Sequence, residues 1–185
     1  MRYDATEYLE AWQETGKFPR IHDAMASAFA AFATRDRLLD LCCCHGLLGA
    51  RLSVQPPGLE CVVGVDADLA AIERGRAAGV PIELHHMRIT LETLKDLASL
   101  IDARKIDVLV ARRAMPELWG QDTHEGIEFS RTMAAAGIRE IFLEGRVKSA
   151  RATNALASID DEIGLFAHEY AVAKRHGAVA YLRRR

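Results

Sequence analysis

The sequence has few features of a secreted or membrane-spanning protein. Its 185 residues contain no apolar run near the roughly 20 residues that a membrane-spanning helix needs. The first residues, MRYDATEYLEAW, carry charges and lack the apolar segment of a signal peptide. We therefore expect a cytoplasmic protein without a membrane segment.

An excess of positive charge is also absent. Lys and Arg total 24 against 26 Asp and Glu, which gives a net charge of −2. Proteins that bind nucleic acids without regard to sequence normally carry a strong positive field, so we do not expect strong non-specific binding of this kind. Only the final run, Arg183–Arg185, is locally basic, and we interpret it as a solvated terminus.

Cysteine is scarce and unevenly placed. The four cysteines stand at positions 42, 43, 44 and 61, unlike the dispersed spacing of a disulfide framework, and we interpret them as reduced thiols. Consecutive residues of a strand point to opposite faces, so Cys42, Cys43 and Cys44 cannot converge with His45 on one tetrahedral ion. We predict no metal site here and favour packing as the role of these cysteines.

The length, with half of the residues apolar, suits one substantial core and is too short for two full domains. Residues 1–36 are predicted to form a helical N-terminal lid or extension. A helix over Asp4–Glu14 carries Tyr8 and Trp12, and a second helix aligns five side chains on one face: Ile21, Met25, Ala28, Phe29 and Phe32. Tyr3, Tyr8 and Trp12 fold over the site if this segment is a lid, and pack in the core if it is not.

Residues 37–185 alternate between short apolar strands and helices. The predicted strands are Arg37–Cys42, Cys61–Val65, Pro81–His85, Asp107–Ala111 and Glu140–Glu144. The predicted helices are Leu47–Ser53, Leu69–Ala78, Leu91–Ala103, Gly126–Ala136 and Asn154–Ile163. This alternation is typical of an α/β fold with a parallel sheet covered on both faces.

The end of the chain departs from this alternation. Two strand-like segments, Phe166–Ala173 and Ala178–Leu182, are joined by only a few residues that include Gly177. So short a connection requires an antiparallel hairpin, because a parallel return needs a crossover of a dozen or more residues.

The turn between the first predicted strand and helix carries the candidate ligand site. In open α/β sheets, helix N-terminal amides at this position favour the anionic part of a nucleotide. About twenty residues after Gly46, the second strand ends at Asp66, where a carboxylate can accept both ribose hydroxyls. The alternative role for Asp66 is the N-cap of the following helix.

The stretch from Asp40 to Gly46 resembles the first motif of class I S-adenosylmethionine-dependent methyltransferases, roughly D/E-x-G-x-G-x-G. The resemblance extends from about Arg37 to the end of the chain and implies a doubly wound, mainly parallel seven-stranded sheet with a C-terminal antiparallel hairpin. It also implies that S-adenosylmethionine is the cofactor and that five residues hold it: Asp40, Cys42, Cys44, Gly46 and Asp66. Cys44 departs from the motif by adding a side chain at the second glycine position. The acidic residue that often follows the third strand is replaced by the run His85, His86, Met87 and Arg88.

The segment ARRAMPELW, after the fourth strand, is the predicted acceptor-facing loop. Arg112 and Arg113 can clamp a phosphate or carboxylate and Glu117 can act as a base, or all three lie in a solvated turn above a packed Trp119. The loop lacks the Asn/Asp-Pro-Pro-aromatic motif of family members that methylate exocyclic amines of bases. It also lacks the Pro-Cys pair of cytosine-carbon methylation. Glu144 and Arg146 follow the fifth strand at the same edge and either face the crevice or pair with each other.

Three functions compete at this stage. The first is an S-adenosylmethionine-dependent methyltransferase whose acceptor and oligomeric state the sequence leaves open. The second is a catalytically degenerate relative that binds a nucleoside or a protein partner. The third, a nicotinamide-dependent oxidoreductase, shares the strand, turn and acidic-residue pattern but is disfavoured by the terminal hairpin and the lack of room for a substrate domain.

Overall fold

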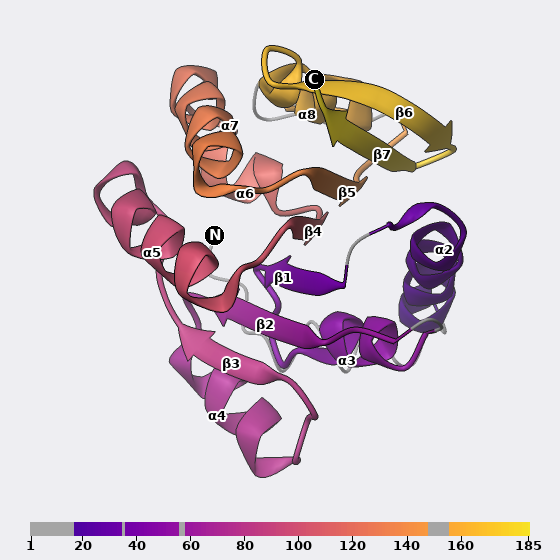
Figure 1. Ribbon diagram of the computed structural model, residues 1–185, viewed down its shortest axis with the longest axis vertical. Coiled ribbons are helices and arrows are strands. Elements are labelled where there is room, and N and C mark those ends of the chain that lie inside the picture. Colours follow the sequence, from indigo (N-terminus) through magenta and orange to yellow (C-terminus); the bar gives the residue numbers. More distant parts are fainter. Residues whose placement is uncertain (1–16, 35, 56–57, 148–155) are drawn as a thin grey trace.

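The computed structural model describes residues 17–34, 36–55, 58–147 and 156–185 (Figure 1). The predicted helix Asp4–Glu14, with Tyr3, Tyr8 and Trp12, lies outside these residues. The strands are β1 (Arg37–Leu41), β2 (Cys61–Asp66), β3 (Glu83–His86), β4 (Val108–Arg112), β5 (Glu140–Glu144), β6 (Tyr170–His176) and β7 (Val179–Arg184). The helices are α2 (Lys17–Phe32), α3 (Leu47–Ser53), α4 (Leu69–Ala77), η1 (Leu91–Thr93), α5 (Leu94–Arg104), α6 (Met115–Trp119), α7 (Thr123–Ala136) and α8 (Ile159–Phe166).

The strands form one seven-stranded sheet in the order β3-β2-β1-β4-β5-β7-β6. Strands β1 to β5 are parallel, while β7 is antiparallel to both β5 and β6. The doubly wound, mainly parallel sheet and its terminal hairpin are therefore confirmed.

Alternate residues of the central strands enter two separate cores, as the two-residue period of a strand requires. Leu39 and Leu109 pack beneath α5, α7 and α8, whereas Leu38 and Val110 pack beneath α2 and α3. Figure 1 shows α5 and α7 on one side of the sheet and α2 and α3 on the other. Because both faces are covered, the central strands are apolar at nearly every position.

Helix α2 contributes to the core on the α2 and α3 side of the sheet. Met25, Ala26 and Phe29 are buried in it, and the Phe29 ring lies 5.0 Å from the ring of Phe142 in β5. This part of residues 1–36 thus covers the sheet, while the domain boundary at residue 37 stays a prediction. No helix in the described part of the chain is long and apolar enough to cross a membrane.

Several predicted boundaries were wrong at the ends of elements. The helix predicted over Asn154–Ile163 begins at Ile159 and runs to Phe166, because a capping box of Ser158 and Asp161 sets its start. Phe166 is therefore helical, and the hairpin strand predicted from it begins only at Tyr170.

A short helix, α6, also replaces part of the loop predicted after β4. Pro116 occupies its first turn, where a missing backbone N–H costs no hydrogen bond.

Candidate functional site

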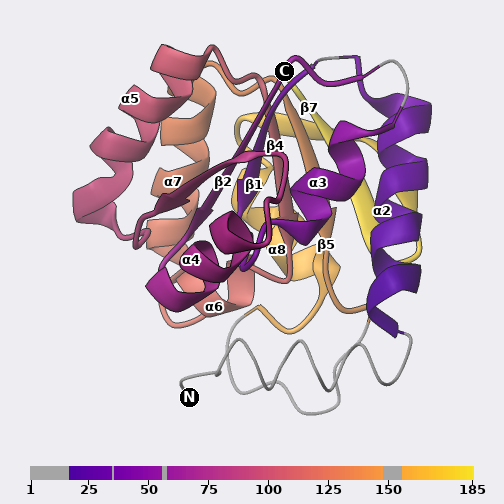
Figure 2. The same cartoon turned by 90° about the horizontal axis from the view of Figure 1, so that it is seen from below.

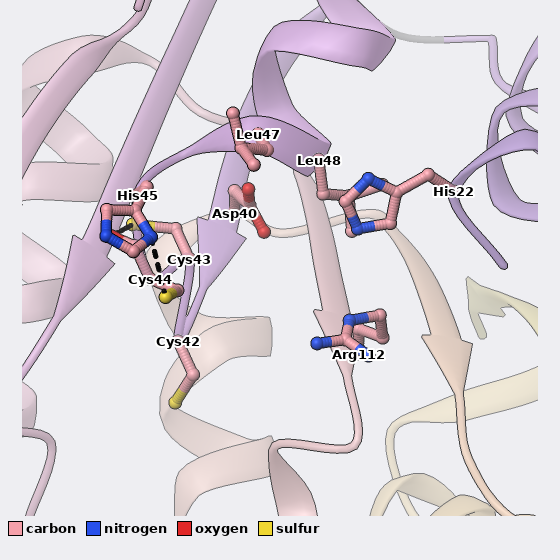
Figure 3. Close-up of a pocket in the computed structure, with 9 residues that line it drawn as sticks. All are labelled: His22, Asp40, Cys42, Cys43, Cys44, His45, Leu47, Leu48 and Arg112. Carbon is pink, nitrogen blue, oxygen red and sulfur yellow. Dashed lines mark hydrogen bonds between the residues drawn. The ribbon is translucent and has the colours of Figure 1, made fainter. Parts of the chain in front are cut away.

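The candidate site lies at the carboxyl ends of β1, β2 and β4, in the centre of the sheet. Strands β1 and β4 are neighbours here, but the chain continues from them toward opposite edges of the sheet. Open α/β sheets bind ligands in the crevice at such a switch point. A small cavity at this position is lined by residues of β1, the following turn, α3, β4 and α2 (Figure 3).

The turn after β1 keeps a backbone conformation that favours glycine, although cysteines occupy it. Cys42 and Cys44 have φ angles of 56° and 54°, in the left-handed region that non-glycine residues rarely adopt. These two residues are the ones that replace the first and second glycines of the motif. The turn is closed by the Cys43 N–H on the Val65 carbonyl at 3.0 Å and the Gly46 N–H on the Cys43 carbonyl at 2.8 Å. The turn therefore combines cysteine side chains with a backbone conformation that is typical of glycine.

Two features of the structure require glycine at position 46. Its φ is 78°, and an added Cβ would lie 2.8 Å from the Ile82 side chain and 2.9 Å from that of Leu84. The residues before and at the start of β3 thus press directly against the end of the turn.

Asp66 joins β2 to this turn. Its Oδ2 accepts a hydrogen bond from the Cys44 N–H at 2.7 Å, and its Oδ1 accepts one from the Asp68 N–H at 2.8 Å. The N-cap of α4 is Asp68, whose side chain accepts from the Ala71 N–H at 3.1 Å. The alternative role of Asp66 as a helix cap is therefore wrong.

Asp40 lies at the floor of the cavity. It is 2% exposed, and its Oδ2 accepts the Gly49 N–H at 2.8 Å, which ties β1 to α3. Burial raises the pKa of Asp40 to about 7, against the opposing effects of this hydrogen bond and of Arg112.

His22 reaches the same cavity from α2, although it was not among the predicted site residues. The side chain is 5% exposed and lies beside Arg112 and Leu48 (Figure 3). Burial, followed by the charge of Arg112, lowers the pKa of His22 to about 4, so the imidazole is neutral at pH 7. A signal was present, since His22 stands three, four and seven residues before the buried Met25, Ala26 and Phe29.

Cys44, His45 and Arg74 form a chain of polar contacts on the outer side of the turn. The Arg74 Nε–H donates to His45 Nε2 at 3.0 Å, and His45 Nδ1 lies 3.2 Å from Cys44 Sγ. Because a guanidinium only donates, Nε2 must accept, and the proton of the neutral ring sits on Nδ1, facing the sulfur. Burial raises the pKa of Cys44 to about 11, so its thiol stays neutral at pH 7.

The described residues include no group of three or more His, Cys, Asp or Glu side chains placed to hold a metal ion. All four cysteines are free, and burial raises the pKa of both Cys42 and Cys43. The absence of a metal stays a prediction, which metal analysis of protein purified without added zinc can test.

The structure separates the two arginines of the predicted acceptor loop. Arg112 ends β4 and lines the cavity near Asp40 and His22. Arg113, with a φ of 52°, turns toward β5, where its Nε lies 3.4 Å from Oε2 of the buried Glu144. Glu144 therefore pairs with Arg113 rather than with the exposed Arg146.

Of the other two residues considered in that loop, Glu117 is exposed and Trp119 is buried. Glu117 lies on α6. Desolvation by the surrounding protein raises the pKa of Glu117, and the charge of Asp66 raises it further, whereas the charges of Arg112 and Arg146 lower it. Trp119 is buried in the core, with its ring 5.5 Å from that of Phe129, so it has the packing role.

The fit of S-adenosylmethionine depends on which part of the site is considered. The turn backbone and the Asp66 carboxylate suit a nucleoside, because each carboxylate oxygen can accept a second hydrogen bond. The cavity, by contrast, has a volume of about 20 Å³, room for one water molecule. Ligand sites usually measure about 300 Å³ or more. A whole donor molecule therefore fits only if the side chains of Cys44, His45 and Leu47 move, or if the ligand lies outside the cavity along the carboxyl ends of the strands.

Comparisons with known proteins bear on the fold. No protein-family model and no curated protein sequence matches the chain. Among solved structures, the N-methyltransferase NodS from Bradyrhizobium japonicum WM9, in complex with S-adenosyl-L-homocysteine, matches with a TM-score of 0.64 and 13% identity over 90% of this chain and 86% of that one. The N-terminal domain of EvdMO1, with S-adenosylhomocysteine bound, matches with a TM-score of 0.59 and 14% identity over 89% and 81%.

The bifunctional kinase-methyltransferase WbdD matches with a TM-score of 0.61 and 16% identity, over 88% of this chain and 38% of its own. The chain thus spans about two fifths of the length of the WbdD and longer EvdMO1 chains that it matches. At such identities the likeness establishes the fold. The sheet order and the antiparallel β7 are the class I methyltransferase topology.

Proposed function

We propose that this protein is an S-adenosylmethionine-dependent methyltransferase that holds its donor at the Cys42–Gly46 turn and at Asp66. The observation that carries the proposal is the left-handed backbone of Cys42 and Cys44, which preserves a glycine turn directly beside a carboxylate. A turn of this shape costs about 1–3 kcal/mol at each non-glycine residue, so its retention is unexpected for a purely structural connection.

The residues of the turn have separate roles in this proposal. Asp66 accepts the ribose hydroxyls with the lone pairs left by its two backbone hydrogen bonds. Gly46 allows the tight turn that brings the first backbone amides of α3 toward the donor. Asp40 lies deeper, at the floor of the cavity, where its carboxyl group faces the polar end of the donor.

When bound, S-adenosylmethionine supplies a methyl group activated by a positively charged sulfur. The chain then has to position an acceptor and to accept a proton where the acceptor carries one. Arg112 and the neutral imidazole of His22 are placed to orient the acceptor, and Glu117 is the candidate proton acceptor at the rim. We also propose a cytosolic location, in keeping with the four free cysteines.

The second candidate function is a degenerate relative that binds a nucleoside or a protein partner without methyl transfer. The cavity of about 20 Å³ and the Cys44 side chain at the second glycine position favour it. In that case the fold is retained as a binding module.

A cofactor screen separates the two candidates. Isothermal titration with S-adenosylmethionine, S-adenosylhomocysteine and NAD⁺ is expected to show binding of the two adenosyl compounds alone. Binding without formation of S-adenosylhomocysteine from any acceptor mixture favours the degenerate module. No binding of either adenosyl compound contradicts both nucleoside-binding proposals, and binding of NAD⁺ alone favours the oxidoreductase.

A further inference from the structure

A second cluster of charged side chains lies at the amino ends of the parallel strands, at the opposite end of the strands from the Cys42–Gly46 turn. Strand β5 begins at Glu140, which pairs with Arg183 near the end of the antiparallel β7. An open hollow of about 600 Å³ at this end of the sheet is lined by Thr34, Arg139, Glu140, Arg183, Arg184 and Arg185. Figure 2 shows the C-terminus at the top of the molecule and α6, which follows the carboxyl end of β4, at the bottom.

The one acidic side chain among the described residues that line the hollow, Glu140, already accepts three hydrogen bonds. Glu140 is 2% exposed, and its Oε2 accepts the Thr34 N–H at 3.0 Å. Its Oε1 accepts the hydroxyl of Tyr181 at 3.0 Å and also that of Thr34. Glu140 therefore anchors the segment after α2 to β5 and β7.

The four arginines carry most of the charge at this end of the sheet. All four side chains are exposed, and Arg183 is the one nearest to Glu140, at 3.8 Å. Within residues 17–34, 36–55, 58–147 and 156–185, the side chains of Arg139, Arg184 and Arg185 form no ion pair. The side chains that line the hollow thus include four guanidinium groups and one carboxylate.

The backbone that carries these arginines is held in place. The Arg184 N–H donates to the Arg139 carbonyl at 2.9 Å, and the Arg185 N–H donates to the Glu169 carbonyl at 3.0 Å. The Arg183 guanidinium lies over the Tyr181 ring, 5.3 Å from its centroid. Of residues 183–185, interpreted from the sequence as a solvated terminus, Arg183 and Arg184 therefore belong to strand β7, and all three line the hollow.

We propose that this hollow binds a small ligand that carries two or more phosphate groups. A planar guanidinium matches the oxygens of a phosphate with two parallel hydrogen bonds, and several of them favour a ligand with several phosphates. The volume falls within the range of roughly 300–1,000 Å³ for small-molecule sites. The net charge of −2 disfavours a long nucleic-acid strand, which would follow a positive surface beyond this end of the sheet. The site is separate from the proposed donor site and does not depend on it.

Isothermal titration of the full chain with inorganic pyrophosphate at low ionic strength tests the proposal. Saturable binding of one pyrophosphate is expected, weakening as salt is added because the charges are exposed. The double change Arg139→Gln and Arg184→Gln is expected to lower the affinity at least about tenfold by removing two charge-assisted contacts. The matched control is Arg175→Gln, an exposed arginine at the other end of the hairpin, which should leave the affinity unchanged.

Three results would overturn the proposal. The first is the absence of pyrophosphate binding by the unmodified chain at low salt. The second is equal binding by the double variant with an unchanged melting temperature. The third is tighter binding of a single-stranded oligonucleotide than of pyrophosphate, lost in the same double variant, which would assign the hollow to nucleic acid instead.

Discussion

The Cys44 N–H donates to Asp66 Oδ2 at 2.7 Å, although the two residues stand 22 positions apart in the sequence. This contact joins the turn after β1 to the end of β2 and places a carboxylate beside the turn that carries the resemblance to methyltransferases. The carboxylate therefore has a structural role as well as the proposed ligand role. The two roles predict different effects of substitution.

Changing Asp66 to Ala is expected to weaken S-adenosylhomocysteine binding by at least about tenfold, because charge-assisted hydrogen bonds contribute on the order of 1.5–3 kcal/mol each. Isothermal titration measures the affinity, and chemical denaturation measures the loss of the two backbone contacts. The matched control is Asp68→Ala, which removes the real cap of α4. It should cost about 1 kcal/mol of unfolding free energy and leave the affinity nearly unchanged. Equal affinity losses in the two variants would contradict a direct role for Asp66.

Replacing Cys44 by Gly is expected to maintain or improve donor affinity and to leave stability unchanged or raised by up to about 1 kcal/mol. Glycine adopts the left-handed conformation at φ 54° without strain, and the change removes the side chain that narrows the turn. The matched control is Cys43→Gly, since Cys43 is buried and does not have a positive φ. That change should destabilise the protein by leaving a small cavity. A loss of affinity in Cys44→Gly would instead show that the thiol contributes to the site.

Arg112, the last residue of β4, and the following Arg113 are expected to respond differently to Ala substitution. Arg113→Ala leaves the buried Glu144 without its partner and should lower the unfolding free energy by on the order of 1–3 kcal/mol. Arg112→Ala should preserve donor affinity and reduce formation of S-adenosylhomocysteine in the presence of an acceptor mixture. Denaturation, titration and product assays on the two variants measure these effects. Reduced donor affinity in Arg112→Ala would move Arg112 from the acceptor side to the donor side.

The buried carboxyl group of Glu162 is expected to make the free energy of unfolding depend on pH. Its side chain is 1% exposed, Oε2 has no hydrogen-bond partner among the described residues, and burial, followed by the charge of Glu144, raises its pKa to about 8. The unfolded chain, with a pKa near 4.5, releases this proton first, so the group destabilises the fold progressively as pH rises from about 4.5 to about 8. Glu162→Gln should therefore be stabilising relative to the unmodified protein, by an amount that grows by up to about 1.4 kcal/mol per pH unit in that window.

Urea denaturation near the two ends of this pH range measures the difference. The control is Glu73→Gln, an exposed change on α4 that should alter stability little at either pH. A stability difference for Glu162→Gln that stays constant across the window would show that Glu162 does not hold its proton in the folded state.

The sequence by itself determined the order and type of most elements, the parallel sheet and its terminal hairpin. These follow from local patterns: apolar strands of about five residues, helices between them, and a connection too short for a crossover. The bounds of α3 and β5 agree with the prediction residue for residue, because clear changes of composition flank them. The motif at Asp40–Gly46 and the position of Asp66 at the end of β2 were equally local features.

Only the tertiary structure decided which side chains meet. It brought His22 from α2 to Asp40 and Arg112, turned Arg113 away to Glu144, and gathered four arginines around Glu140. Periodicity indicates which face of an element is buried, but not which residue of another element lies opposite. That choice depends on the sheet order, the strand register and the packing of helices on each face, all of which involve residues distant in the sequence.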